Sequence, residues 1–169
     1  MKELEEDGHS SGGPAADVSL RPATAEDAPL LTAWFADPRV YRAWGGRPKS
    51  IEEVLAKYTG RRAPQVECRL VVVAGHPCAF VQYVDVGAER AVDLFVVPEH
   101  QRRGVGAAAV AVLAAAAAAA GCDRLSADPD LSNEVGLRFW AAVGFRPERV
   151  VDDEPGREPY LKMVLPLLE

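Results

Sequence analysis

The chain has 169 residues, of which 49% are hydrophobic and 26% are charged, as in an ordinary globular domain. Its net charge is −6, and one lysine against five carboxylates places −4 of this charge in residues 1–17. The rest of the chain therefore carries only −2, which argues against a nucleic-acid-binding surface and permits a cationic small molecule as partner.

The three cysteines are odd in number and have no metal-binding spacing: they are Cys68, Cys78 and Cys122. We therefore expect reduced thiols, no metal and a cytoplasmic location. The N-terminus has no apolar segment of the kind found in signal peptides. The longest apolar run, residues 105–120, is mostly alanine and too short to span a bilayer, so no membrane contact is expected.

Residues 1–17 are acidic and rich in Gly and Ser, which predicts a disordered tail before a single domain over residues 18–169. In chain order the first expected elements are a strand at 18–21, a helix capped by Thr24 with Asp27 in a capping-box position, a helical piece at 38–44, a helix between Ser50 and Gly60, and strands at 66–74 and 78–86. The segment Gly75-His76-Pro77 is expected to form the turn of this last hairpin.

The second half of the chain predicts four more strands and two longer helices. In order they are a strand at 91–97, an alanine-rich helix closed by Gly121, a strand at 124–127, a helix from its cap Ser132 to Gly144, and strands at 145–151 and 159–165. Hairpins and crossovers alternate around one sheet, which is typical of the α+β class.

A glycine-bearing loop, residues 101–106, connects the strand at 91–97 to the alanine-rich helix. Unpaired backbone N–H groups converge at a helix N-terminus and make it an anion site. Gly104 and Gly106 allow the backbone to approach a ligand without an intervening Cβ. A lone Gly-x-Gly would favour a plain arginine-rich turn, but the helix start, the two glycines and the strand before them together favour a pyrophosphate cradle.

The same segment resembles the Q/R-x-x-G-x-G/A motif of the GNAT acyltransferases. The matching residues are Gln101, Gly104 and Gly106, preceded by Leu94, Val96 and Pro98, and followed further on by Asn133, Phe139-Trp140 and Gly144-Phe145. The resemblance implies a GNAT fold of the α+β class, in which helices flank a central mixed, mostly antiparallel sheet with splayed fourth and fifth strands.

The resemblance also implies acetyl-CoA as co-substrate, with loop amides on its pyrophosphate and an amide near Val96 or Val97 on its thioester. The residues it implies in coenzyme binding are Val96, Val97, Gln101, Arg102, Arg103, Gly104, Val105, Gly106, Ala107, Asn133 and Trp140. Trp140 stands where many GNAT enzymes have a tyrosine that protonates the leaving thiolate, which an indole N–H cannot do. Either water or another residue such as Tyr160 takes this role, or turnover is slow.

The N-terminal half narrows the resemblance to aminoglycoside 6′-N-acetyltransferases and the related kasugamycin 2′-N-acetyltransferases. The similar segments are Ala33-Trp34, Trp44-Gly45-Gly46, Gln82-Tyr83, Val92-Asp93 and Asp128-Pro129. This implies acetylation of the 6′ or 2′ amine of an aminoglycoside antibiotic, which confers resistance, and a homodimer, which is common in the family. The implied substrate-binding residues are Trp44, Gln82, Asp93 and Asp128.

Asp93 is a carboxylate in an otherwise apolar strand, and such a group is rarely buried without a partner. It either faces outward on a half-exposed sheet or opens onto the substrate site, where it would bind an ammonium and act as catalytic base. The resembling enzymes assign the matching aspartate this role. Asp128 either starts a turn or grips a second amino group, and Trp44 either fills the core or forms a wall of the sugar pocket.

Two alternatives to an aminoglycoside acetyltransferase remain. One is an N-acyltransferase acting on a lysine-like amine in siderophore assembly, which would need a pocket for one amine and a longer acyl chain. The other is a CoA-binding module without catalysis, suggested by Trp140 in place of the tyrosine.

Overall fold

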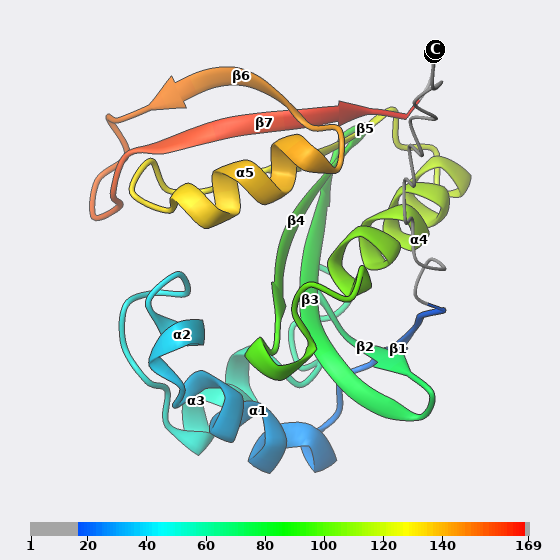
Figure 1. Ribbon diagram of the computed structural model, residues 1–169, viewed down its shortest axis with the longest axis vertical. Helices are drawn as coiled ribbons and strands as arrows, with labels where there is room; N and C mark the ends of the chain where they lie inside the picture. Colours follow the sequence, from blue (N-terminus) through cyan, green and yellow to red (C-terminus); the bar gives the residue numbers. More distant parts are fainter. Residues whose placement is uncertain (1–16, 168–169) are drawn as a thin grey trace, which may run out of the picture.

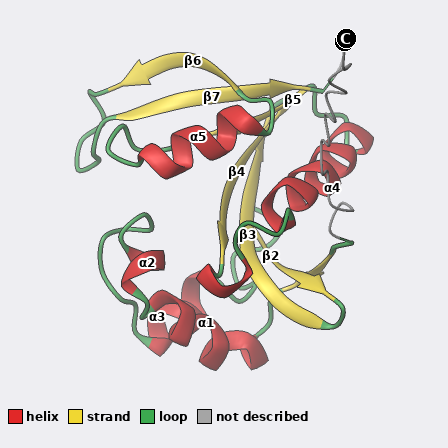
Figure 2. Ribbon diagram, viewed as in Figure 1, coloured by secondary structure: helices red, strands yellow, loops and turns green. Residues whose placement is uncertain are grey.

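The computed structural model describes residues 17–167, in which seven strands form one mixed sheet (Figures 1 and 2). The strands are β1 (Ser19–Pro22), β2 (Glu67–Val73), β3 (His76–Val86), β4 (Glu89–Val96), β5 (Arg124–Ala127), β6 (Arg146–Val151) and β7 (Tyr160–Pro166). The helices are α1 (Ala28–Phe35), α2 (Pro38–Tyr41), α3 (Ile51–Lys57), α4 (Val105–Ala119) and α5 (Glu134–Ala142), with single 3₁₀ turns at Ala25–Asp27 and Pro98–His100. The tail expected over residues 1–17 lies outside the described residues, apart from Asp17.

The strand order is β1-β2-β3-β4-β5-β7-β6, and every neighbouring pair is antiparallel except β4 with β5. The β4–β5 pairing is short, because only Glu89–Ala91 pair with Arg124–Ser126. Beyond Ala91 the two strands diverge, and the far end of β4 has a free edge. The expected α+β class, the mostly antiparallel sheet and the splay between the fourth and fifth strands are thereby confirmed.

Helices cover both faces of the sheet and define two apolar clusters. Side chains alternate between the faces along each strand, so Val81 and Val92 pack against α4, whereas Phe80 packs against α1 and α3. Figure 1 shows α4 on one side of β3 and β4, with α1, α2 and α3 on the other. The small side chains of Ala109 and Ala117 are fully buried and let α4 lie close to the strands. No helix within residues 17–167 is long and apolar enough to cross a membrane.

Two local predictions are corrected by the structure. The β2–β3 turn consists of Ala74 and Gly75, with φ of 50° and 80°, because two residues of positive φ match the twist of the flanking strands; His76 and Pro77 already belong to β3. Helix α5 is capped by Asn133 and not by Ser132, because the Asn133 side chain accepts the Gly136 N–H at 3.0 Å.

Candidate active site

The loop before α4 has the backbone geometry of an anion-binding concavity. Arg102 and Gly104 adopt left-handed conformations with φ of 62° and 76°, and α4 begins at Val105. Alternation of this kind turns successive N–H groups toward the same side, and the positive end of the fifteen-residue helix adds to the field there. For a non-glycine residue such as Arg102 the left-handed conformation costs about 1–2 kcal/mol, so the surrounding loop holds it in place.

The side chain of Gln101 ties this loop to the end of β4. Its Nε2 donates to the Val96 carbonyl at 3.0 Å, so the amide donor is engaged within the protein. The side chains of Arg102 and Arg103 are exposed beside the concavity, where they can reach a bound anion.

Of the two amides considered for the thioester, one in the last residue of β4 and one just after it, only one faces the splayed edge. The Val97 N–H donates to the Cys78 carbonyl at 2.9 Å and is therefore occupied by the β3–β4 ladder. Hydrogen bonds alternate in direction along an antiparallel strand, so the Val96 N–H faces the edge from which β5 has diverged. The expectation that the Val97 amide binds the thioester is thus corrected, because neighbouring amides on a strand point to opposite edges and that of Val97 is hydrogen-bonded to β3.

Gly106 lies in the first turn of α4, directly under the ring of Phe139 from α5. A Cβ at this position would lie 2.8 Å from Phe139 Cε2 and 3.4 Å from Val96 Cγ2. Close packing of α4 against α5 and β4 therefore requires the glycine, in addition to any approach by a ligand. Val105 is buried beside it, whereas Ala107 is exposed in the same turn.

Two residues expected at the coenzyme, the cap of α5 and one residue within this helix, have structural roles. Asn133 uses its side-chain oxygen to cap the helix. Trp140 is 6% exposed and packs edge-to-face against Phe139 and Phe145, with ring centroids 4.9 and 4.8 Å away, so its indole belongs to the core. This packing leaves little of the Trp140 ring exposed for contact with a coenzyme.

Tyr160 is not free to replace the missing tyrosine of α5. Its hydroxyl donates to Glu154 Oε2 at 2.9 Å, and the residue is only 8% exposed. Burial, followed by the hydrogen bond to Glu154, raises the pKa of the phenol.

On the acceptor side, Gln82 and Asp93 are cross-strand partners on β3 and β4. Gln82 Nε2 donates to Asp93 Oδ2 at 3.0 Å, and Asp93 is exposed. Asp93 lies two residues beyond the last residue of β4 that pairs with β5, which places it at the opening of the splay. Tyr83 points to the opposite face, where the Arg90 guanidinium stacks on its ring at 4.1 Å.

Asp128 directly follows β5, and Asp93 lies near enough for its charge to act on the Asp128 carboxyl group. One of its carboxylate oxygens, Oδ1, is buried and has no hydrogen-bond partner within the described chain. Arg157 Nη1 lies 3.9 Å from the other oxygen, and Arg157 Nη2 donates to the Asp128 carbonyl at 3.1 Å. Burial raises the pKa of Asp128; the charge of Arg157 opposes this shift and that of Asp93 adds to it.

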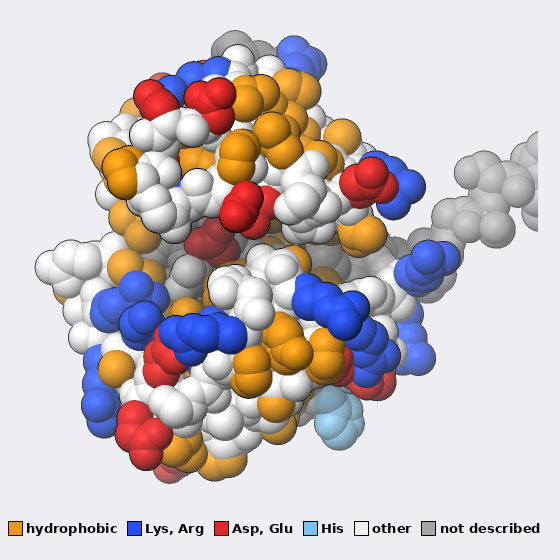
Figure 3. Space-filling model, turned by 90° about the vertical axis from the view of Figure 1, so that its left-hand side faces the viewer, with side chains coloured by type: hydrophobic (Ala, Val, Ile, Leu, Met, Phe, Trp, Pro, Cys, Tyr) orange, Lys and Arg blue, Asp and Glu red, His pale blue; other side chains and the backbone are white. Residues whose placement is uncertain are grey.

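Figure 3 views the molecule from the side on which the splay opens. It shows a hollow between the part formed by α1–α3 and the part formed by α5, β6 and β7. Acidic side chains lie in the hollow, and Lys and Arg side chains line its lower rim. The carboxylates within the hollow suit a ligand that carries positive charge, whereas the basic lower rim suits anionic groups.

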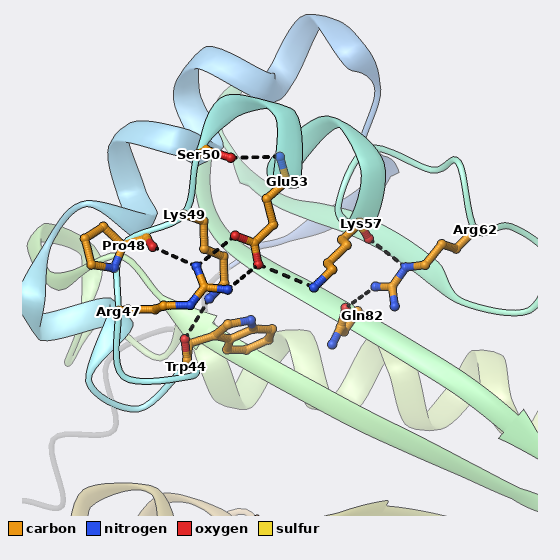
Figure 4. Close-up of polar contacts among 9 residues, drawn as sticks. All are labelled: Trp44, Arg47, Pro48, Lys49, Ser50, Glu53, Lys57, Arg62 and Gln82. Carbon is orange, nitrogen blue, oxygen red and sulfur yellow. Dashed lines mark hydrogen bonds and ion pairs between the residues drawn. The ribbon is translucent and has the colours of Figure 1, made fainter. Parts of the chain in front are cut away.

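Trp44 belongs mainly to the core beside this hollow. Its half-buried ring lies 5.2 Å from that of Phe95 and 5.8 Å from that of Phe80, centroid to centroid. The loop that carries it is tied down by Lys49, whose Nζ donates to the Trp44 carbonyl at 3.0 Å, and by a bidentate Arg47–Glu53 pair (Figure 4). Phe95 shares a strand face with Asp93, so the aromatic cluster adjoins the carboxylate.

Replacing Asp128 by Asn is expected to change the stability of the protein and its affinity for a cationic acceptor in opposite directions. A carboxyl group whose pKa is raised by folding binds its proton more tightly in the folded state, so its ionised form at neutral pH destabilises the protein. We expect Asp128→Asn to stabilise the protein at pH 7 by about 1 kcal/mol, or roughly 2–4 °C in Tm, and to weaken binding of a cationic acceptor. The gain in Tm should shrink as the pH falls toward 3.8, the ordinary pKa of an aspartate carboxyl group, because Asp128 is then protonated in both states. Equal Tm values at pH 7, measured by calorimetry, would contradict this assignment.

Two residues at this site were missed by the sequence analysis, namely Arg62 beside Gln82 and Arg157 beside Asp128. Both lie in loops with no local pattern that marks them as functional. Within residues 17–167, no group of three or more His, Cys, Asp or Glu side chains is arranged to hold a metal ion.

Comparison with known proteins identifies the family. Residues 23–153 match the profile of the acetyltransferase (GNAT) domain. The structure resembles aminoglycoside acetyltransferase AAC(6′)-Ib in complex with coenzyme A and kanamycin, with a TM-score of 0.78 and 20% identity over 89% of this chain and 95% of the other. It also resembles spermidine N-acetyltransferase from Vibrio cholerae in complex with CoA and spermine (TM-score 0.75, 15% identity, 89% and 95% coverage) and an acetyltransferase from Thermus thermophilus (0.72, 26%, 88% and 96%). No curated protein sequence matches the chain.

The match over residues 23–153 places the chain among the acyltransferases, and the anion-binding loop at the N-terminus of α4 agrees with the coenzyme A present in the similar structures. The chain belongs to the GNAT acetyltransferase family.

Proposed function

We propose that the protein transfers an acetyl group from acetyl-CoA to an amino group of an aminoglycoside antibiotic, and that this reaction confers resistance. The observation that carries the proposal is the pair of carboxylates, Asp93 and Asp128, on opposite sides of the splay. The charge of Asp93 contributes to the raised pKa of Asp128, so the two groups lie within electrostatic reach of each other. A polycationic acceptor would place one ammonium on each and satisfy the buried Asp128 Oδ1.

In the proposed mechanism the acyl donor lies along the free edge of β4, with its pyrophosphate on the amides of residues 101–106. Asp93 binds the reacting ammonium and takes up its proton, because only the neutral amine can attack the thioester. Attack forms a tetrahedral intermediate, whose oxyanion the Val96 N–H stabilises. The C–S bond then breaks, the nitrogen gives its extra proton to solvent as the amide forms, and solvent water in turn protonates the leaving thiolate.

The resemblance to AAC(6′)-Ib bound to kanamycin and to ribostamycin supports this choice of acceptor. We expect thiol release from acetyl-CoA with kanamycin or ribostamycin, and a higher inhibitory concentration of the accepted antibiotic in cells that express the protein. A screen that also contains kasugamycin, spermidine and N6-hydroxylysine would reveal the other acceptors. Turnover with N6-hydroxylysine alone would favour the siderophore-type reaction.

Coenzyme binding and thiol release, measured together, distinguish an enzyme from a CoA-binding module. A ligand at 100 times its Kd stabilises the folded state by roughly 2.7 kcal/mol, so acetyl-CoA should raise the Tm by several degrees. A rise in Tm without thiol release for any amine tested would identify a non-catalytic module. No rise in Tm would contradict the coenzyme assignment itself.

A further inference from the structure

A chain of hydrogen bonds connects Asp93 to the end of helix α3. Gln82 Nε2 donates to Asp93 Oδ2 at 3.0 Å, and Arg62 Nη2 donates to Gln82 Oε1 at 3.1 Å. Arg62 lies twenty residues before Gln82 in the sequence, in the loop between α3 and β2. Figure 4 shows the guanidinium reaching from this loop to the carboxamide on β3.

The two neighbours of Gln82 leave its carboxamide a single favourable orientation. One end of the amide donates and the other accepts, so the NH₂ group must face the Asp93 carboxylate. The reversed amide would point its oxygen at that carboxylate and its NH₂ at the guanidinium, which has only donors. Without Arg62, the orientation would depend on Asp93 alone.

Arg62 is itself held by the fold. Its Nε donates at 2.9 Å to the carbonyl of Lys57, the last residue of α3, which satisfies one of the free carbonyls at that helix end. Its guanidinium lies 5.8 Å from the ring centre of Tyr58, which is 7% exposed in the aromatic cluster. The guanidinium is planar, so the Nε hydrogen bond and the contact with the Tyr58 ring together determine the direction of its remaining N–H donors.

We propose that Arg62 is a positioning residue for the transfer reaction, which fixes the Gln82 carboxamide and through it the direction of the Asp93 carboxylate. Within the described chain Gln82 is the only residue whose side chain hydrogen-bonds Asp93, and it occupies Oδ2. The other oxygen, Oδ1, accepts no side-chain hydrogen bond within the described chain and so stays available to the reacting amine. The inference rests on the proposed role of Asp93, and it assigns Arg62 no contact with the substrate.

The test compares Arg62→Gln with the adjacent Arg61→Gln, since Arg61 is exposed and has no ion pair within residues 17–167. With kanamycin as acceptor, we expect Arg62→Gln to lower kcat between about 10- and 100-fold, because misplacement of a catalytic group acts on the reaction step. The KM for acetyl-CoA should not change, and Arg62→Lys should recover part of kcat. Arg61→Gln should behave as the wild type.

A double-mutant cycle distinguishes positioning from a general effect on folding. Because Arg62 acts through Gln82, adding Arg62→Gln to Gln82→Leu should cause no further loss of kcat. Multiplicative losses would overturn the proposal. The proposal would also be overturned if Arg62→Gln had the kcat of the wild type while Asp93→Asn was inactive. The role of Asp93 would then stand without a positioning role for Arg62.

A measurement without substrate covers the case in which kanamycin is not an acceptor. In ¹⁵N NMR spectra, the Gln82 side-chain NH₂ signals should shift on Asp93→Asn and on Arg62→Gln, and stay unchanged on Arg61→Gln. Unchanged Gln82 signals in Arg62→Gln would overturn the positioning role whatever the acceptor is.

Discussion

Replacement of Asp93 by Asn is expected to lower kcat for acetyl transfer by about 10²–10⁴-fold, the usual contribution of a general base. Asn keeps the size of the side chain and can accept from Gln82 Nε2 through its oxygen, but it cannot take up the proton of an ammonium. Affinity for acetyl-CoA should stay nearly unchanged, because the loop that would hold the coenzyme begins eight residues later. Steady-state thiol release and calorimetric titration with acetyl-CoA would measure the two quantities.

The pH dependence of the variant gives a second, independent expectation. Without a base, the reaction depends on the small fraction of acceptor that is already neutral, which rises about tenfold per pH unit below the pKa of an alkyl amine near 10.4. The rate of Asp93→Asn should therefore climb with pH more steeply than that of the wild type. Asp123→Asn is the matched control, since Asp123 is an exposed carboxylate at the opposite end of β5. Full activity of Asp93→Asn at neutral pH would show that the base lies elsewhere.

The sequence predicted those parts of the fold that depend on local chemistry. Ser50 was identified as a cap and does accept the Glu53 N–H at 3.2 Å, and Gly104 was placed at the start of the alanine-rich helix, where its φ of 76° requires a residue without a Cβ. Errors of one residue occurred where neighbours have similar chemistry. Ser132 and Asn133 are both good caps, and only the packed structure decides between them.

The site was less predictable, because its geometry depends on contacts between distant segments. The register of β3 on β4 determines that the ladder uses the Val97 amide and leaves that of Val96 free. Arg62 meets Gln82 across twenty residues of sequence, and Arg157 meets Asp128 across twenty-nine. No periodicity or capping signal encodes such pairs. Residue type and the resemblance to the GNAT enzymes therefore made the two carboxylates candidates, but gave no indication of the arginines that accompany them.

Replacement of Gly106 by Ala is expected to destabilise the protein and to weaken acetyl-CoA binding at least tenfold. The first turn of a helix would ordinarily gain up to about 1 kcal/mol from this change. Here the new Cβ would lie 2.8 and 3.1 Å from Cε2 and Cζ of Phe139, and overpacking of this kind costs about 1–3 kcal/mol. Relief of the contact would move α4 away from α5 and β4 and tilt the amides of its first turn. Thermal melts and titration with acetyl-CoA would measure the two effects.

A second substitution tells whether the glycine serves the packing of helices or the approach of the ligand. Phe139→Leu removes the two ring atoms that would meet the new Cβ, and so should restore much of the stability and the coenzyme affinity of Gly106→Ala. Phe139→Leu alone provides the reference for the cavity that it creates. If the double variant regains stability but still binds acetyl-CoA as weakly as Gly106→Ala, then the Cβ obstructs the coenzyme itself. The glycine would in that case be required by the ligand, as the anion-binding loop first suggested, and the contact with Phe139 would be secondary.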